Sequence, residues 1–135
     1  MKWKYVEALK NKNAIIDFLN EQEISLPDDI ITFISEHNAG SPENNRFDTN
    51  VHKECVFNEV PSYNEDDPGN IYGIYAGELR DVLRKHGLFP IAIDPGGDLI
   101  CVDMTDQNKI VLLRTENDRR EFISENIDGL LNKLY

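Results

Sequence analysis

Carboxylate and amide oxygens gather between residues 94 and 108, which makes this segment the first place to look for chemistry. Such oxygens are preferred ligands of Ca²⁺, but an EF-hand loop needs them at alternate positions with a closing glutamate, and that spacing is missing. Glycines that cradle phosphate lead into a helix N-terminus, whereas Gly96-Gly97 lead into the strand-like LICVDM. The stretch DPGGD, residues 94–98, therefore predicts a hairpin turn in which both glycines have a positive φ, and not a metal or phosphate site.

Histidine and cysteine also form no catalytic or metal-binding pattern. The three histidines stand singly, without a second His or Cys at ligand spacing. His52-x-Glu54 matches the H-x-E of zinc deaminases, but the accompanying P-C-x-x-C is missing. Cys55 and Cys101 lie far apart in apolar runs, and buried free thiols are the simplest interpretation.

The remaining catalytic patterns give the same answer. The sequence has no G-x-S-x-G elbow, no Cys/His pair with an orienting partner and no lysine in an apolar context. Asp66 and Asp67 are adjacent in a polar loop, where nothing evident would raise a carboxyl pKa. We therefore predict that the protein is not an enzyme and that it holds no metal or cofactor.

Acidic side chains dominate the composition. The chain has 25 Asp and Glu against 14 Lys and Arg, a net charge of −11. This field repels phosphates and anionic lipid, so nucleic acid and membranes are not expected partners. A basic protein is the more natural partner, although acidity that serves solubility alone remains an open alternative.

Three helical regions are expected before the strands. Apolar residues at helical spacing over 3–19 predict one bent helix or two short ones. Pro27 lies in the first turn of a second helix, which ends at Asn38-Ala39-Gly40 with Gly40 in the left-handed conformation. Asn70 caps a third helix that closes at Gly87.

The strands and the last helix complete the expected fold. Asp118 and Glu121 are spaced as a capping pair for a C-terminal helix that carries Phe122 to Leu134. Short polar turns join three of the strands as a meander, which predicts antiparallel pairing. The fold class is α+β: one domain over 1–135, with a mainly antiparallel sheet of about four to six strands flanked by helices. The expected strands are 51–57, 89–94, 99–104 and 109–114.

Several segments occur in a known order. They are Leu26-Pro27-Asp28-Asp29-Ile30 leading to Phe33, then Asn38-Ala39-Gly40, and later Pro90-Ile91-Ala92 leading to Gly97-Asp98-Leu99-Ile100-Cys101-Val102-Asp103. The chain resembles the SUKH superfamily, the Smi/Knr-type cell-wall-regulator fold, over nearly its whole length. One departure is Asn38-Ala39-Gly40, where the family tends to have Asn-Gly-Gly. The resemblance implies a single α+β domain with an antiparallel sheet flanked by helices.

The resemblance also implies a class of function. Bacterial members are commonly immunity proteins of contact-dependent or polymorphic toxin systems, which bind and neutralise a cognate toxin that is often a nuclease. Fungal relatives regulate cell-wall synthesis. The hypothesis is thus a cytoplasmic immunity protein, since the N-terminus has no apolar signal region. A regulatory scaffold and a small-ligand-binding domain are the alternatives.

Candidate partner-binding residues follow from charge and predicted exposure, and the family motif does not mark them. Segment 58–70 is the most acidic loop that we expect to be exposed. Acidic groups here could pair with Lys and Arg of a basic toxin. The candidates are Glu59, Glu65, Asp66 and Asp67, followed by Asp94, Asp98 and Asp106.

Overall fold

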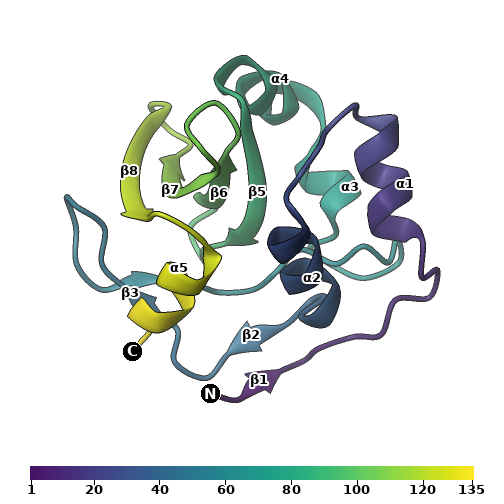
Figure 1. Ribbon diagram of the computed structural model, residues 1–135, viewed down its shortest axis with the longest axis horizontal. Helices are drawn as coiled ribbons and strands as arrows, with labels where there is room; N and C mark the ends of the chain where they lie inside the picture. The colour runs from purple at the N-terminus through teal and green to yellow at the C-terminus, as the bar shows by residue number, and fades with distance from the viewer.

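A four-stranded antiparallel sheet in the order β5-β6-β7-β8 forms the centre of the computed structural model, which describes residues 1–135 (Figure 1). Two small sheets, β1-β2 and β3-β4, lie near the chain ends. This confirms the expected α+β class with a mainly antiparallel sheet. The strands are β1 Trp3–Lys4, β2 Ser41–Pro42, β3 Arg46–Phe47, β4 Cys55–Val56, β5 Leu88–Ile93, β6 Leu99–Asp103, β7 Lys109–Arg114 and β8 Arg119–Ser124.

Helices flank the sheet. In Figure 1, α1, α2 and α3 lie on the β5 side, while α4 leads directly into β5. The last helix, α5, packs against both α2 and β8. No helix combines the length and the apolar character that crossing a membrane would require. The helices are α1 Ala14–Glu21, α2 Asp28–Glu36, α3 Ile71–Ile74, α4 Gly77–His86 and α5 Ile127–Lys133.

The central strand β6 is buried along its whole length, as its continuous apolar run predicts. Strand β5 is one of the two edge strands of the sheet, and its end is covered by a bridge between Glu59 and Ile93. Phe47, Phe57 and Phe89 are among the largest fully buried side chains. Residues far apart in the sequence therefore share one core with the meander.

The DPGGD segment is a hairpin turn, as expected. The Oδ1 atom of Asp94 accepts hydrogen bonds from the backbone N–H groups of Gly96, at 2.9 Å, and Asp98, at 2.8 Å. Only Gly97 has a positive φ, of 95°, so the expectation that both glycines supply one was wrong for Gly96. The Asp94 side chain thus closes the turn through one of its two carboxylate oxygens.

The N-terminal segment differs from the expected helix. Trp3 lies in β1 opposite Pro42, and the first helix begins only at Ala14. The Trp3 ring packs edge-on against Phe33 and Phe57, with centroids 5.9 and 5.8 Å away. This tertiary packing explains Trp3, whereas Ile15 and Leu19 lie in α1 as the helical spacing predicted.

The end of α2 corrects a second expectation. Ala39, and not Gly40, has the left-handed conformation, with a φ of 62°. A Cβ atom on Gly40 would lie 2.9 Å from Cγ2 of Val6 and 3.0 Å from the carbonyl oxygen of His37. Gly40 is therefore required for close packing, and Ala39 carries the backbone strain.

The third helical region divides in two. Asn70 caps α3 as expected, because its Oδ1 accepts from the Gly73 N–H at 2.9 Å. Gly77, with a φ of 58°, begins a separate helix, α4, which ends at Gly87 with the expected left-handed φ of 67°. The expected strand 51–57 is reduced to β4, because Glu54 has a φ of 58° that interrupts extended backbone.

The expected capping pair of the last helix was wrong. Asp118, with a φ of 58°, lies in a turn, and Glu121 lies in β8, which pairs with β7. The helix begins at Ile127 instead, where Asn126 Oδ1 accepts from the Gly129 N–H at 2.8 Å. Asp118 and Glu121 thus have the spacing of a capping pair, but they lie in the β7–β8 turn and in the fourth strand of the meander.

Candidate functional site

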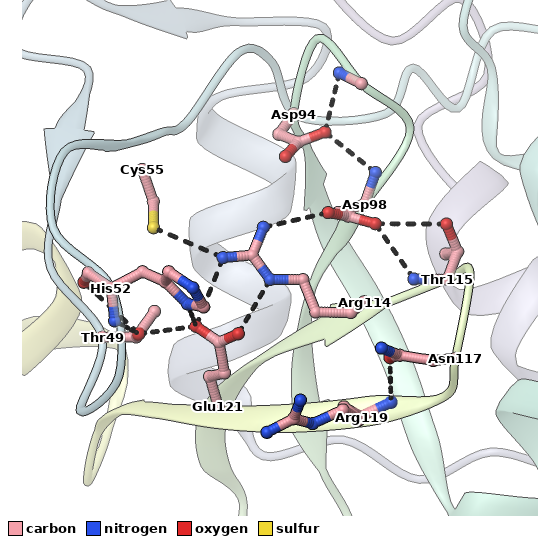
Figure 2. Close-up of polar contacts among 11 residues, drawn as sticks. Thr49, His52, Cys55, Asp94, Asp98, Arg114, Thr115, Asn117, Arg119 and Glu121 are labelled. Atoms are coloured by element: carbon pink, nitrogen blue, oxygen red, sulfur yellow. Dashed lines mark hydrogen bonds and ion pairs between the residues drawn. The ribbon is translucent and has the colours of Figure 1, made fainter.

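A polar cavity of about 360 Å³ opens where the β5–β6 and β7–β8 turns meet. Arg114 stands at its centre (Figure 2). We call Thr49, His52, Asp98, Arg114 and Glu121 the Arg114 cluster. No hydrophobic residue lines the cavity, whose walls are His52, Asp98, Arg114, Glu116, Asn117, Arg119 and Glu121.

The sheet register places the central ion pair. Leu112 is opposite Glu121, and Arg114 is opposite Arg119. Residues two positions apart lie on the same face of a sheet, so Arg114 and Glu121 are diagonal neighbours on one face. The β7–β8 turn thereby brings opposite charges together at the end of the sheet.

Arg114 binds two carboxylates. Its Nε donates to Oε2 of Glu121 at 2.8 Å, and its Nη2 donates to Oε1 at 3.3 Å. Its Nη1 donates to Oδ2 of Asp98 at 3.1 Å. The two-pronged contact with Glu121 is the geometry in which guanidinium and carboxylate bind best. These hydrogen bonds raise the pKa of Arg114 further.

Glu121 also holds the loop that precedes β4. Its Oε1 accepts from Thr49 Oγ1 at 2.7 Å and lies 2.9 Å from Nδ1 of His52. Only 6% of its side chain is exposed. Burial alone would raise the pKa of Glu121, but the hydrogen bonds from Arg114, Thr49 and His52 outweigh it and lower the pKa to about 2.

Asp98 joins the two turns. Besides Arg114, it binds Thr115, whose backbone N–H and hydroxyl both donate to Oδ1, at 2.9 and 3.1 Å. Figure 2 shows Asp98 between Arg114 and Thr115, with Asp94 bonded inside its own turn. Asp98, a predicted partner-binding residue, thus has internal partners for both carboxylate oxygens.

The contacts of the cluster are suited to holding structure in place. Glu121 stays ionised far below neutrality, and burial raises the pKa of the Cys55 thiol despite the nearby Arg114. The Arg114 guanidinium already has carboxylate partners for its Nε, Nη1 and Nη2. The Arg114 cluster therefore joins the segment 49–55 to the sheet through a network of ion pairs.

The acidic loop 58–70 is only partly exposed. Glu65 and Asp66 are exposed, and Asp66 contacts Lys10. Asp67 is half-buried and accepts from Ser62 Oγ at 2.7 Å and Asn64 Nδ2 at 3.2 Å. Its carboxylate therefore organises the loop from inside.

The other predicted partner-binding residues are dispersed. Glu59 is half-buried beside the end of β5, and burial raises its pKa. Asp106 is exposed at the β6–β7 turn, at the opposite end of the sheet from the β5–β6 turn, and its Oδ1 lies 3.4 Å from Nζ of Lys109. The seven candidates thus form no single site, and their role as partner contacts stays a prediction.

Sequence reasoning missed the members of the Arg114 cluster other than Asp98. Thr49 and Arg114 carried no motif, His52 was considered as a single histidine and in an incomplete H-x-E pattern, and Glu121 was assigned to a helix cap. The sequence of β8 shows no apolar–polar alternation, because Glu121 is charged and Phe122 and Ile123 are both apolar, so no local signal marked the strand. That strand would have placed Glu121 beside Arg114.

Comparison with known proteins identifies the family. The model of the SMI1-KNR4 cell-wall family, SUKH_6, matches residues 4–131. No curated protein matches the chain. The match confirms the resemblance drawn from the α2 region and the β5–β6 hairpin. With all but a few terminal residues covered, the chain belongs to the SUKH superfamily, in its SMI1-KNR4 cell-wall family.

Proposed function

We propose that this protein is a non-catalytic immunity protein that binds and neutralises a cognate toxin in the cytoplasm of the toxin-producing cell. The toxin would have a basic surface, as nucleases do, and would belong to a polymorphic or contact-dependent system. Family membership supports the class of protein. The distribution of charge supports the nature of the partner.

One observation carries the proposal: an exposed acidic surface runs along α1 and α2, with Arg84 of α4 at the C-terminal end of α1. Between residues 13 and 45 the chain has seven Asp and Glu and no Lys or Arg. All seven side chains are exposed, and none of them forms an ion pair. The seven are Asp17, Glu21, Glu23, Asp28, Asp29, Glu36 and Glu43.

Such a surface has a direct physical use. Unpaired carboxylates of one sign speed the encounter with a basic protein and disfavour acidic partners. On a nuclease they would occupy the places of nucleic-acid phosphates and form charge-assisted hydrogen bonds with Lys and Arg. Neutralisation by this route needs binding alone and no chemistry by this chain.

A regulatory scaffold is the second candidate function, because the description of the matching family refers to the cell wall. A scaffold would use the same acidic surface, but for proteins of cell-wall synthesis. The two candidates differ in what the neighbouring gene encodes. Only the immunity function requires a toxic partner.

The test is coexpression in a host that lacks this system. The C-terminal domain encoded directly upstream is expressed alone, with this protein, and with an unrelated acidic protein of similar size as the control. We expect growth arrest in the first and third cases and growth in the second. Copurification should then give a stoichiometric complex that weakens as salt is raised.

Two results would contradict the proposal. The upstream domain might be harmless by itself, or it might arrest growth equally with and without this protein. Either result would leave the scaffold function as the remaining candidate. Rescue by the unrelated acidic protein would show that charge alone, and not this surface, is responsible.

A further inference from the structure

A groove between α2 and α5 has an acidic rim and a partly apolar floor. One part, of about 270 Å³, is lined by Phe33, Ile127 and Leu131 together with three carboxylates. A second part, of about 180 Å³, shares Asp29 and Ile127 with the first and therefore lies next to it. We call the two parts the α2–α5 groove. No Lys or Arg lines either part.

The carboxylates of the groove have no side-chain partners. Glu36, Glu125 and Asp128 accept no hydrogen bond and form no ion pair, and Asp29 accepts only from the adjacent Ile30 N–H, at 2.9 Å. All four residues are exposed. No three His, Cys, Asp or Glu side chains of the protein converge as they would around a metal ion. The four acids therefore form a rim and not a cation cage.

The dimensions of the groove favour a protein partner over a small molecule. Small-molecule sites are usually cavities of roughly 300–1,000 Å³. Each part of the groove is smaller than this range and is open at the surface. An apolar side chain that enters beside Leu131 would cover the partly exposed floor, while flanking basic side chains reach the rim.

From this geometry we propose that the α2–α5 groove docks a cationic segment of the partner protein, in which one apolar side chain lies between Lys or Arg residues. The inference rests on the proposed function for the identity of the partner, but its chemistry can be tested separately. It assigns the contact to Asp29, Glu36, Asp128 and Leu131, none of which was among the residues predicted from the sequence.

The first experiment uses a synthetic amphipathic peptide of Lys and Leu at helical spacing as the probe, with a Glu/Leu peptide of equal length as the control ligand. Nitrogen-15 NMR spectra of the full-length protein locate the contact. We expect chemical-shift changes confined to α2 and α5 with the Lys peptide and none with the Glu peptide. Shifts spread equally over α1 and loop 58–70 would overturn the proposal.

Matched variants distinguish peptide binding at the groove from binding to acidic side chains elsewhere on the protein. The groove variant is Asp29→Asn/Glu36→Gln/Asp128→Asn, and the control variant Asp17→Asn/Glu21→Gln/Glu23→Gln removes the same charge around α1. Peptide affinity should fall about tenfold in the groove variant and less than about twofold in the control. Equal losses in the two variants would overturn the proposal.

Leu131→Ala tests the apolar part of the contact. We expect affinity to fall about threefold in this variant, by a factor that stays the same between low and high salt, because lost apolar contact is not screened. Circular dichroism and thermal unfolding of each variant confirm the fold. Unchanged peptide affinity in folded Leu131→Ala would show that only charge acts, against the proposal.

The coexpression assay keeps the two proposals distinguishable. If the unaltered protein rescues growth and the groove variant rescues equally well, the groove inference fails and the immunity function stands. If the unaltered protein does not rescue growth but the peptide binds the groove as expected, the immunity function fails and the docking surface stands.

Discussion

The Arg114 cluster and the α2–α5 groove are built from similar carboxylates but use them in opposite ways. In the cluster, Asp98 and Glu121 share one guanidinium, and Glu121 has only 6% of its side chain exposed. In the groove, Asp29, Glu36 and Asp128 are exposed and have no Lys or Arg among the lining residues.

The difference separates carboxylates that hold the fold from those that are free to bind. A buried charge must be paired, because an unpaired one is costly, so the cluster carboxylates are committed to internal partners. An exposed charge adds little to stability. Substitutions should therefore alter stability at the cluster and partner affinity at the groove.

The largest effect is expected from Arg114→Met. It removes the shared cation and leaves Glu121 and Asp98 without their main partner, which should lower the free energy of unfolding by about 4 kcal/mol. Urea unfolding at pH 7 measures the loss. The matched control is Arg119→Met, because Arg119 is exposed and forms no ion pair; its effect should stay within about 0.5 kcal/mol. A similar loss in the free energy of unfolding for Arg114→Met and Arg119→Met would contradict the stabilising role of the cluster.

Acid should remove the stabilisation that Glu121 gives the cluster. The pKa of Glu121 is lowered from 4.5 to about 2, so its stabilisation is complete above about pH 5 and disappears as the pH falls towards 2. This group alone accounts for about 3 kcal/mol of pH dependence. Urea unfolding between pH 7 and pH 2 should give a flatter profile for Glu121→Gln than for the unaltered protein. Parallel profiles would contradict the assigned role.

Loop 58–70 contains a carboxylate with internal hydrogen-bond partners and an exposed carboxylate without them. Asp67 accepts hydrogen bonds from two buried residues, Ser62 and Asn64, whereas Glu65 is exposed and its side chain has no partner. Asp67→Ala should lower the free energy of unfolding by about 1 kcal/mol, and Glu65→Ala by less than about 0.5 kcal/mol. Thermal unfolding compares the two. A larger loss at Glu65 would show that exposure does not separate the two kinds.

The smallest effect is expected at the last residues of α1 and α2, where an acidic side chain opposes the helix dipole. Glu36→Lys and Glu21→Lys should each raise the free energy of unfolding by about 0.5 kcal/mol. Only Glu36→Lys should also weaken binding of the Lys/Leu peptide, because Glu36 lines the groove. Equal weakening by both variants would show that the acidic surface acts as a whole.

Much of the meander could be predicted from the sequence. Its strands are apolar, and polar turns separate them, so hairpin rules sufficed for 88–114. Helix α2 was also marked, by Pro27 and the acidic first turn. These signals are local, which is why a single sequence displays them.

The missed features depend on contacts between distant residues. The segment around Trp3 is extended because Trp3 packs on Phe33 and Phe57, which no local pattern reveals. The Arg114 cluster depends on strand β8, which was not predicted because Asp118 and Glu121 were interpreted as a helix-capping pair. The α2–α5 groove forms because two helices about a hundred residues apart in the sequence pack against each other, and no local sequence pattern predicts that packing.

The span of the Arg114 cluster also bears on the rate of unfolding. Thr49 and Glu121 are 72 residues apart in the sequence, whereas the turns of the meander join neighbouring strands. Closing the longer loop costs more chain entropy, so we expect these bonds to form after the transition state for folding. Thr49→Ala should then leave the refolding rate nearly unchanged and make the native protein unfold faster, so that its lifetime shortens while its folding time stays the same.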